Sequence, residues 1–316
     1  MHTEVMKLYE NREDVTLTAY VVADSVELTD GKDRPAILIC PGGAYLNCSD
    51  REGEPIALRF AAMGYHAFVL RYSTFTEGKG GFPDMSQEIT PKEHCQHPNP
   101  MREIGKAMLM IRERAKEWLV DVDRIALCGF SAGAHNSAMY ATHWHTPLLS
   151  EFYGVNPEVF KPAAVILGYM LSDYVFMKNT ADKMGKMDQA LFELANIAFL
   201  GTASPEEEML ANVSPALHVT ENTPPTFLWA TAADSLVPVQ HTIRMSHALA
   251  DQKIPFEVHI FEEGAHGLSL ATQASATAKS QINSDAAKWV PMAEAWLSKR
   301  FELLLPEKTI WEEMQP

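Results

Sequence analysis

The sequence of 316 residues lacks several features that mark specialised classes of protein. It has no run of about 18 uncharged apolar residues, and no apolar stretch follows a basic start at its amino terminus. These absences predict a cytoplasmic protein with no membrane segment. The four cysteines have no CxxC spacing, so we expect reduced, mostly structural thiols.

Basic residues are also few. The sequence has 26 Lys and Arg against 41 Asp and Glu, for a formal net charge of −15, and the cations are scattered along the chain. Without a positive stripe, neither nucleic acid nor an anionic membrane is an expected partner. Hydrophobic residues make up 47% and charged residues 21%, which is typical of a folded soluble protein. A small neutral molecule is the partner that this composition permits, and a homo-oligomer stays open.

Short apolar runs alternate with amphipathic stretches along the chain, a pattern typical of α/β proteins. Alternation over VTLTAYVV, followed by a turn at residues 30–32, predicts an antiparallel start to the sheet. After it we expect a mostly parallel twisted sheet with helices on both faces, in a single domain over residues 1–316. The predicted strands are 15–22, 36–40, 66–70, 125–128, 163–167, 227–231 and 256–261, with the last five buried on both faces, and the predicted helices are 55–63, 101–119, 132–142, 239–251 and 286–304.

Two segments, 73–100 and 169–215, are longer than ordinary connections. The second contains an amphipathic stretch over residues 188–199. Both would emerge near the carboxyl ends of strands, where open α/β sheets bind ligands, so we expect pocket or lid insertions. The aromatic residues Phe75 and Tyr169 could belong to the core or stack on a sugar.

The sequence CGFSAG places a G-x-S-x-G motif between a strand pattern and a helix pattern. A serine at the apex of such a turn is strained, and small residues at Gly129 and Gly133 prevent collisions around it. The turn exposes the hydroxyl of Ser131 and directs the N–H of Ala132 at the same point, where a helix dipole favours negative charge. Ser131 is the predicted nucleophile. The alternative is a simple glycine-rich connection.

A second oxyanion donor is expected after the earlier strand 36–40, where the sequence reads PGGAY. Its glycines would let backbone amides approach an oxyanion. Gly43 is the first candidate and Ala44 the second, with an ordinary turn as the alternative.

The acid and the base are expected after later strands, in the chain order Ser, Asp, His. Asp234 follows the strand 227–231, and His266 follows the strand 256–261 between two glycines that permit a loop reaching back to Ser131. Asp173, which follows an earlier strand, is the rival acid. A helix-capping role is the alternative for Asp234.

The histidine pairs His94/His97 and His143/His145 lack the spacing and third ligand of a zinc site. We therefore expect neither a metal nor an organic cofactor.

These motifs together resemble one family. From Pro35 to Leu270 the chain is similar to the bacterial acetyl esterase and acetylxylan-esterase-like branch of the α/β-hydrolases, akin to the hormone-sensitive-lipase-like esterases. The matching segments are PGGAY at 41–45, DVDRIALCGFSAGAH at 121–135, SPALHV at 214–219, PPTFLWATAADSLVPV at 224–239 and EEGAHGL at 262–268.

The resemblance implies an α/β-hydrolase fold and a serine triad of Ser131, Asp234 and His266, with oxyanion donors at Gly43 and Ala132. It also implies short acyl esters, acetyl esters of sugars first, as substrates. An amide-cleaving relative and a non-catalytic binding protein remain alternatives. Pro41 and Ala44 depart from the family's HGGG loop, and Glu263 and Ala265 from the small residues before its histidine, which puts the shape of the acyl pocket in question.

Overall fold

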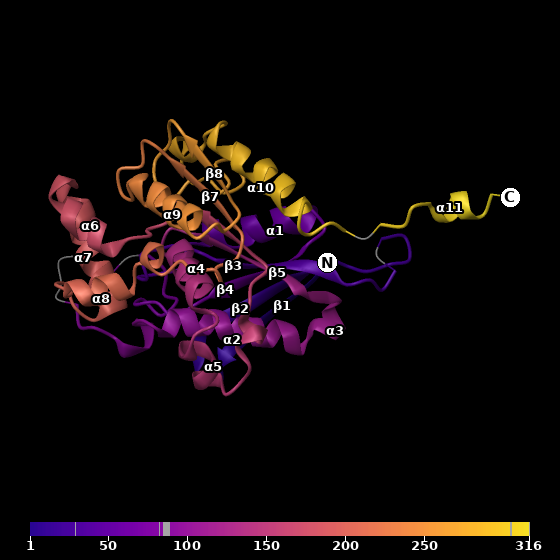
Figure 1. Cartoon of the computed structure of the whole chain (residues 1–316), viewed down its shortest axis with the longest axis horizontal. Coiled ribbons are helices and arrows are strands. Elements are labelled where there is room, and N and C mark those ends of the chain that lie inside the picture. Colours follow the sequence, from indigo (N-terminus) through magenta and orange to yellow (C-terminus); the bar gives the residue numbers. More distant parts are fainter. Residues whose placement is uncertain (29, 82, 85–88, 304, 316) are drawn as a thin grey trace.

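The computed structural model describes residues 1–28, 30–81, 83–84, 89–303 and 305–315, and an eight-stranded sheet runs through the centre of the protein (Figure 1). The strand order is β1-β2-β4-β3-β5-β6-β7-β8. The pairs β1–β2 and β2–β4 are antiparallel, and all later pairs are parallel. This confirms the predicted mostly parallel sheet with an antiparallel start. The strands are β1 His2–Tyr9, β2 Arg12–Val21, β3 Arg34–Cys40, β4 His66–Arg71, β5 Val120–Phe130, β6 Ala164–Gly168, β7 Thr226–Thr231 and β8 Phe256–Phe261.

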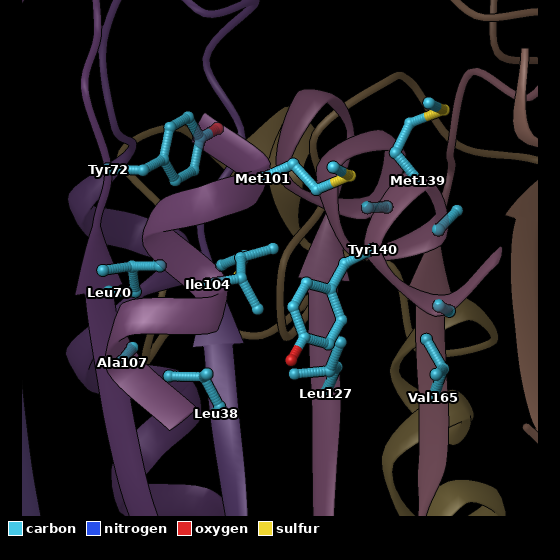
Figure 2. Packing of buried hydrophobic residues seen from close by; sticks show 14 of the residues in the cluster. Leu38, Leu70, Tyr72, Met101, Ile104, Ala107, Leu127, Met139, Tyr140 and Val165 are labelled. Carbon is cyan, nitrogen blue, oxygen red and sulfur yellow. The ribbon is translucent and has the colours of Figure 1, made fainter. Parts of the chain in front are cut away.

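Helices cover both faces of this sheet because its central strands are apolar on both sides. The main helices are α1 Glu54–Ala62, α2 Asn99–Glu113, α3 Ala115–Trp118, α4 Ala132–His143, α5 Pro147–Tyr153, α9 Gln240–Asp251 and α10 Trp289–Ser298. Residues of α2, α4 and α9 build one hydrophobic cluster on the sheet, and residues of α1 and α10 build a second. Figure 2 shows the first, where Ile104 of α2 lies near Leu38 and Tyr140 of α4 lies near Leu127.

One strand was missed and one predicted strand needs correction. The strand β1 was not predicted, because it lies at an edge and only Leu8 is fully buried, so its apolar alternation is weak. The strand 256–261 was predicted to be buried on both faces. As β8 it forms the opposite edge of the sheet, and Ile260 is 43% exposed.

Two predicted helices also differ in extent. The helix predicted over 101–119 is two helices, α2 and α3, separated by Arg114, whose guanidinium bonds Glu4 of β1 at 2.8 Å. The helix predicted over 286–304 begins as a 3₁₀ turn over Ala286–Lys288, and α10 spans only Trp289–Ser298. Pro291 in the first turn of α10 has no N–H, which suits a helix start and not a helix interior. Residue 304 lies outside the described residues.

The two long segments differ in character. In 73–100 the described residues form irregular loops and the short 3₁₀ turn Glu93–Cys95 before α2 begins at Asn99. Segment 169–215 is largely helical, with α6 Tyr174–Thr180, α7 Lys186–Leu200 and α8 Glu207–Asn212. These three helices gather at one end of the protein, far from the short carboxyl-terminal helix α11 Ile310–Glu313 (Figure 1). Among the helices of the described residues, none combines the length and apolar character that crossing a bilayer requires.

Candidate active site

Ser131 occupies the turn between β5 and α4, at φ 50° and ψ −121°. Such a positive φ is strained for a residue with a side chain, and the surrounding structure holds it: the Ser131 N–H donates to the carbonyl of Gly168 at 3.0 Å. Both flanking glycines are sterically required. A Cβ at Gly129 would lie 2.4 Å from the carbonyl oxygen of Gly133, and one at Gly133 would lie 2.0 Å from that of Cys40. The turn therefore has the close packing that the motif predicts.

A chain of hydrogen bonds joins the three predicted triad residues. The Nε2 atom of His266 lies 2.8 Å from Ser131 Oγ, and its Nδ1 atom lies 2.7 Å from Asp234 Oδ2. The other carboxylate oxygen, Oδ1, accepts from the backbone N–H groups of Leu236 at 3.0 Å and Val237 at 2.9 Å. Asp234 is thus held as an acceptor, which favours a proton on Nδ1 and leaves Nε2 free to take one from Ser131.

Charge and burial act in opposite directions on the histidine. Burial lowers the pKa of His266, but the charge and hydrogen bond of Asp234 raise it, and the net shift is upward. The side chain of Asp234 is only 1% exposed. A buried carboxylate of this kind stabilises the imidazolium that forms when the ring takes a proton.

The rival acid, Asp173, lies elsewhere. Its Oδ1 atom accepts from the N–H of Phe176 at 2.8 Å, capping α6, and its Oδ2 atom bonds Arg244 at 3.0 Å. Of the two candidate acids, the structure therefore brings Asp234 to the histidine.

The predicted oxyanion turn follows β3 and lies directly against Ser131. A Cβ added at Gly42 would be 2.8 Å from the Cβ of Ser131. Gly43, Ala44 and Tyr45 have φ of 132°, 57° and 58°. The N–H of Gly42 donates to Glu52, so it is not free to bind a ligand. Within the described residues, the N–H groups of Gly43, Ala44 and Ala132 donate to no protein oxygen and remain available.

Sequence reasoning missed two residues that support the site. Glu52, in the 3₁₀ turn η1 Asp50–Glu52, accepts from Gly42 at 2.7 Å and from the hydroxyl of Tyr169 at 2.6 Å. Arg51 donates to the carbonyl of Gly267, next to the histidine, at 2.9 Å. Both lie in a polar loop with no motif, so only the pairing of opposite charges in CSDREGE could have drawn attention to them. The sequence allowed Tyr169 either a place in the core or a role in stacking on a sugar. In the structure its side chain is buried, with only 3% exposed.

A small apolar cavity of about 60 Å³ opens beside Ser131. One wall comes from the oxyanion turn and α4, the other from α6 and α7 of segment 169–215. Its lining includes Ala44, Tyr45, Ser131, His135, Tyr174, Met177, Leu191 and Phe192. The volume suits a group of a few heavy atoms, since a liquid water molecule occupies about 30 Å³.

The histidine pairs considered for a metal do not build a ligand set. Among the described residues, no group of three or more His, Cys, Asp or Glu side chains could hold an ion. His94 Nε2 lies 3.6 Å from Glu77 Oε1, and the His143 ring packs at a tilt of 60° against that of His218. All four cysteines are free.

Comparisons with known proteins identify the family of the chain. Residues 27–249 match the family BD-FAE. Among curated proteins, the chain is 32% identical over 259 residues to endo-1,4-beta-xylanase B of Butyrivibrio fibrisolvens, covering 81% of this chain and 35% of that protein. It is also 24% identical to esterase LipQ of Mycobacterium tuberculosis, covering 71% of this chain and 48% of that protein. The chain thus spans about a third to a half of these relatives.

Solved structures resemble the chain over nearly its whole length. The α/β-hydrolase enzyme MGS-M1, from a Medee basin deep-sea metagenome library, is 31% identical with a TM-score of 0.68, covering 96% of this chain and 99% of that one. The carboxylesterase Cest-2923 of Lactobacillus plantarum is 26% identical with a TM-score of 0.75, covering 97% and 100%. The acetyl ester-xyloside bifunctional hydrolase of Caldicellulosiruptor lactoaceticus is 26% identical with a TM-score of 0.68, covering 94% and 96%.

The sheet, the strained serine turn and these relatives confirm the predicted fold and the resemblance to carboxylesterases of the α/β-hydrolases. The chain belongs to the BD-FAE family.

Proposed function

We propose that this chain is a serine carboxylesterase that hydrolyses short-chain acyl esters, acetyl esters of carbohydrates first, through an acyl-enzyme on Ser131. The observation that carries the proposal is the hydrogen-bond chain from Ser131 Oγ through His266 to Asp234, at 2.8 and 2.7 Å. It lies beside a glycine turn whose free N–H groups face no protein acceptor among the described residues. Together they supply a nucleophile, a base, an orienting acid and oxyanion donors.

In the proposed reaction, His266 Nε2 takes the proton of Ser131 as Oγ attacks the ester carbonyl. The N–H groups of Gly43 or Ala44 and of Ala132 stabilise the tetrahedral oxyanion. His266 then protonates the leaving alcohol, and the acyl group stays on Ser131. A water molecule, deprotonated by the same histidine, attacks the acyl-enzyme and releases the carboxylic acid.

The preference for short acyl groups rests on the cavity of about 60 Å³ beside Ser131, which is apolar and partly closed by α6 and α7. We assign the acyl group to it. The carbohydrate part of the proposal is supported by the names of two relatives, a xylanase and an acetyl ester-xyloside hydrolase. We further propose one catalytic domain over residues 1–316, in which 169–215 is an insertion that shapes the pocket and 73–100 is a second one.

The test is hydrolysis of p-nitrophenyl esters from acetate to octanoate, and of an acetylated xylo-oligosaccharide, by wild type and Ser131→Ala. We expect turnover that falls steeply beyond short chains, with the alanine variant slower on the order of 10⁶-fold. An alanine variant as fast as wild type would exclude Ser131 as the nucleophile. Turnover of formyl or acyl amides instead of esters would move the protein to the amidases. If a fluorophosphonate fails to label the folded wild-type protein, that result would favour a non-catalytic binding protein.

A further inference from the structure

A buried network connects the oxyanion turn to the loop that carries His266, and Glu52 lies at its centre. The carboxyl group of Glu52 receives two hydrogen bonds, from the Gly42 N–H at 2.7 Å and from the Tyr169 hydroxyl at 2.6 Å. Gly42 begins the oxyanion turn. The Tyr169 ring packs edge-on against the His266 ring, with centroids 5.0 Å apart at 73°. One carboxyl group is thus connected to both halves of the site, to the oxyanion turn directly and to His266 through Tyr169.

The neighbouring residues fasten the same two parts. Arg51 donates from its guanidinium to the carbonyls of Ser275 at 2.6 Å and Gly267 at 2.9 Å. The carbonyl of Arg51 accepts from the Ser269 hydroxyl at 2.6 Å. The histidine loop is therefore tied to η1 at several points, and η1 is tied through Glu52 to the turn against Ser131.

The direction of the hydrogen bonds at Glu52 favours its ionised form. The Tyr169 hydroxyl accepts from the Ser269 N–H at 3.0 Å, which leaves its own proton for Glu52. The Gly42 N–H donates to the other carboxyl oxygen, so both oxygens act as acceptors. Burial raises the pKa of Glu52, the bonds from Tyr169 and Gly42 offset part of the rise, and the net shift is upward.

We propose that Glu52 is a positioning residue of this site, which fixes the oxyanion turn and the His266 loop relative to each other and whose charge stabilises the protonated imidazole. The proposal rests on the proposed function for its kinetic consequences. Two carboxylates then act on the histidine in different ways. Asp234 binds the ring directly, whereas Glu52 acts through Tyr169 and through the electric field in a water-poor region.

The charged side chains that act on His266 come from several elements. Asp234 lies after β7, Glu52 and Arg51 lie in η1, and Asp188 lies on α7. Among them, the pKa of His266 is raised most by Asp234, followed by smaller contributions from Glu52 and Asp188. Arg51 directs its guanidinium to backbone carbonyls. Neutralising Glu52 alone should therefore lower the pKa of His266 and keep the base unprotonated at lower pH.

The experiment measures kcat/KM for p-nitrophenyl acetate between about pH 5 and 9 for wild type, Glu52→Gln, Tyr169→Phe and Glu54→Gln, because this profile reports the groups of the free enzyme. Glu54 is exposed and two residues away, so Glu54→Gln controls for the loss of a charge. For Glu52→Gln we expect kcat/KM to be lower on the order of 10–10²-fold. We also expect the acid limb of the profile, where kcat/KM falls as the histidine is protonated, to move to lower pH. Tyr169→Phe keeps the carboxylate, so it should lose rate without moving the limb.

Two results would overturn the proposal. One is a Glu52→Gln variant whose acid limb coincides with that of wild type, which removes the role of the charge. The other is wild-type rates in Tyr169→Phe, which removes the tie between turn and loop and can be measured even if Glu52→Gln does not fold.

A direct NMR titration of the His266 ring in wild type and Glu52→Gln needs no turnover. It separates failure of the Glu52 proposal from failure of the esterase proposal, which would show as turnover independent of Ser131. An unchanged ring pKa in Glu52→Gln would contradict the proposal in either case.

Discussion

At the scale of single residues, two aspartates have similar positions in the sequence and different surroundings in the fold. Asp173 and Asp234 both follow a parallel strand near the same sheet edge, so order along the chain alone could not choose between them. Their contacts distinguish the two aspartates, because Asp173 caps α6 and pairs with Arg244, whereas Asp234 forms a hydrogen bond with His266.

Exchanging each aspartate for asparagine tests this distinction. Asp234→Asn should lower kcat on the order of 10⁴-fold, because an amide favours the wrong tautomer of the histidine. Asp173→Asn keeps an N-cap acceptor and loses one partly exposed ion pair, so its activity should stay near wild type and its unfolding free energy fall by at most about 1 kcal/mol. Esterase assays and urea unfolding of both variants provide the comparison. Equal losses of kcat would mean that Asp234 has no special role.

The predictable residues of the site are those whose chemistry requires a local pattern. Ser131 is found from two glycines that its turn needs, and His266 from a loop between glycines after a strand. Glu52 and Arg51 could not be found in this way. Their partners are 10 to more than 200 residues away in the chain, so no local pattern records the contact.

At the scale of elements, the helices of segment 169–215 decide the shape of the pocket. The amphipathic stretch predicted over 188–199 is confirmed as helix, within α7. Its periodicity shows that one face is apolar but not what that face covers. In the structure, Leu191 and Phe192 of this helix line the cavity beside Ser131.

Shortening the side chain of Phe192 should therefore change acyl preference. In Phe192→Ala we expect kcat/KM for p-nitrophenyl hexanoate to rise relative to acetate by about tenfold, since each methylene accommodated in an apolar pocket is worth about 1–3 kcal/mol. Met187→Ala is the matched control on the same helix, because Met187 is 71% exposed. An identical chain-length profile in Phe192→Ala and wild type would place the acyl group elsewhere.

At the scale of the whole molecule, the fold was predictable because each buried parallel strand is a short apolar run followed by an amphipathic helix. Edge strands were not predictable, because a strand that pairs on one side only and is partly exposed to solvent has a weak hydrophobic pattern. This accounts for the missed β1 and for the misjudged burial of β8. Pairing is likewise a long-range property. On one side β2 pairs with β1, which precedes it in the chain, and on the other side it pairs with β4, which follows after β3.

One buried carboxyl group should make global stability depend on pH. Glu103 of α2 is 2% exposed and accepts from the N–H and the hydroxyl of Ser73, at 2.6 and 2.5 Å, where β4 ends. Burial raises the pKa of Glu103 from 4.5 to about 7. Since the folded pKa is the higher one, the native state binds the extra proton. Its stabilising contribution is complete below the unfolded pKa and is lost as pH rises through about 7.

In Glu103→Gln the amide oxygen can accept from the Ser73 N–H while the amide nitrogen donates to the Ser73 hydroxyl, so both contacts are kept and the titration is removed. Between about pH 4 and 8 the unfolding free energy of wild type should fall relative to this variant by about 3 kcal/mol. Urea unfolding at both pH values measures the difference, and Glu113→Gln, at the exposed end of α2, serves as control. Parallel pH dependence in wild type and Glu103→Gln would mean that Glu103 does not titrate in this range.

The strained turn at Ser131 has a consequence for the protein during its synthesis. Its backbone conformation depends on a bond to Gly168 of the next strand, and its base arrives only with the loop after β8. A growing chain that has passed Ser131 therefore carries an ordinary serine, without an activated hydroxyl. Under the proposed mechanism the triad is complete only after the loop that follows β8 has reached Ser131, so a chain interrupted earlier would lack esterase activity.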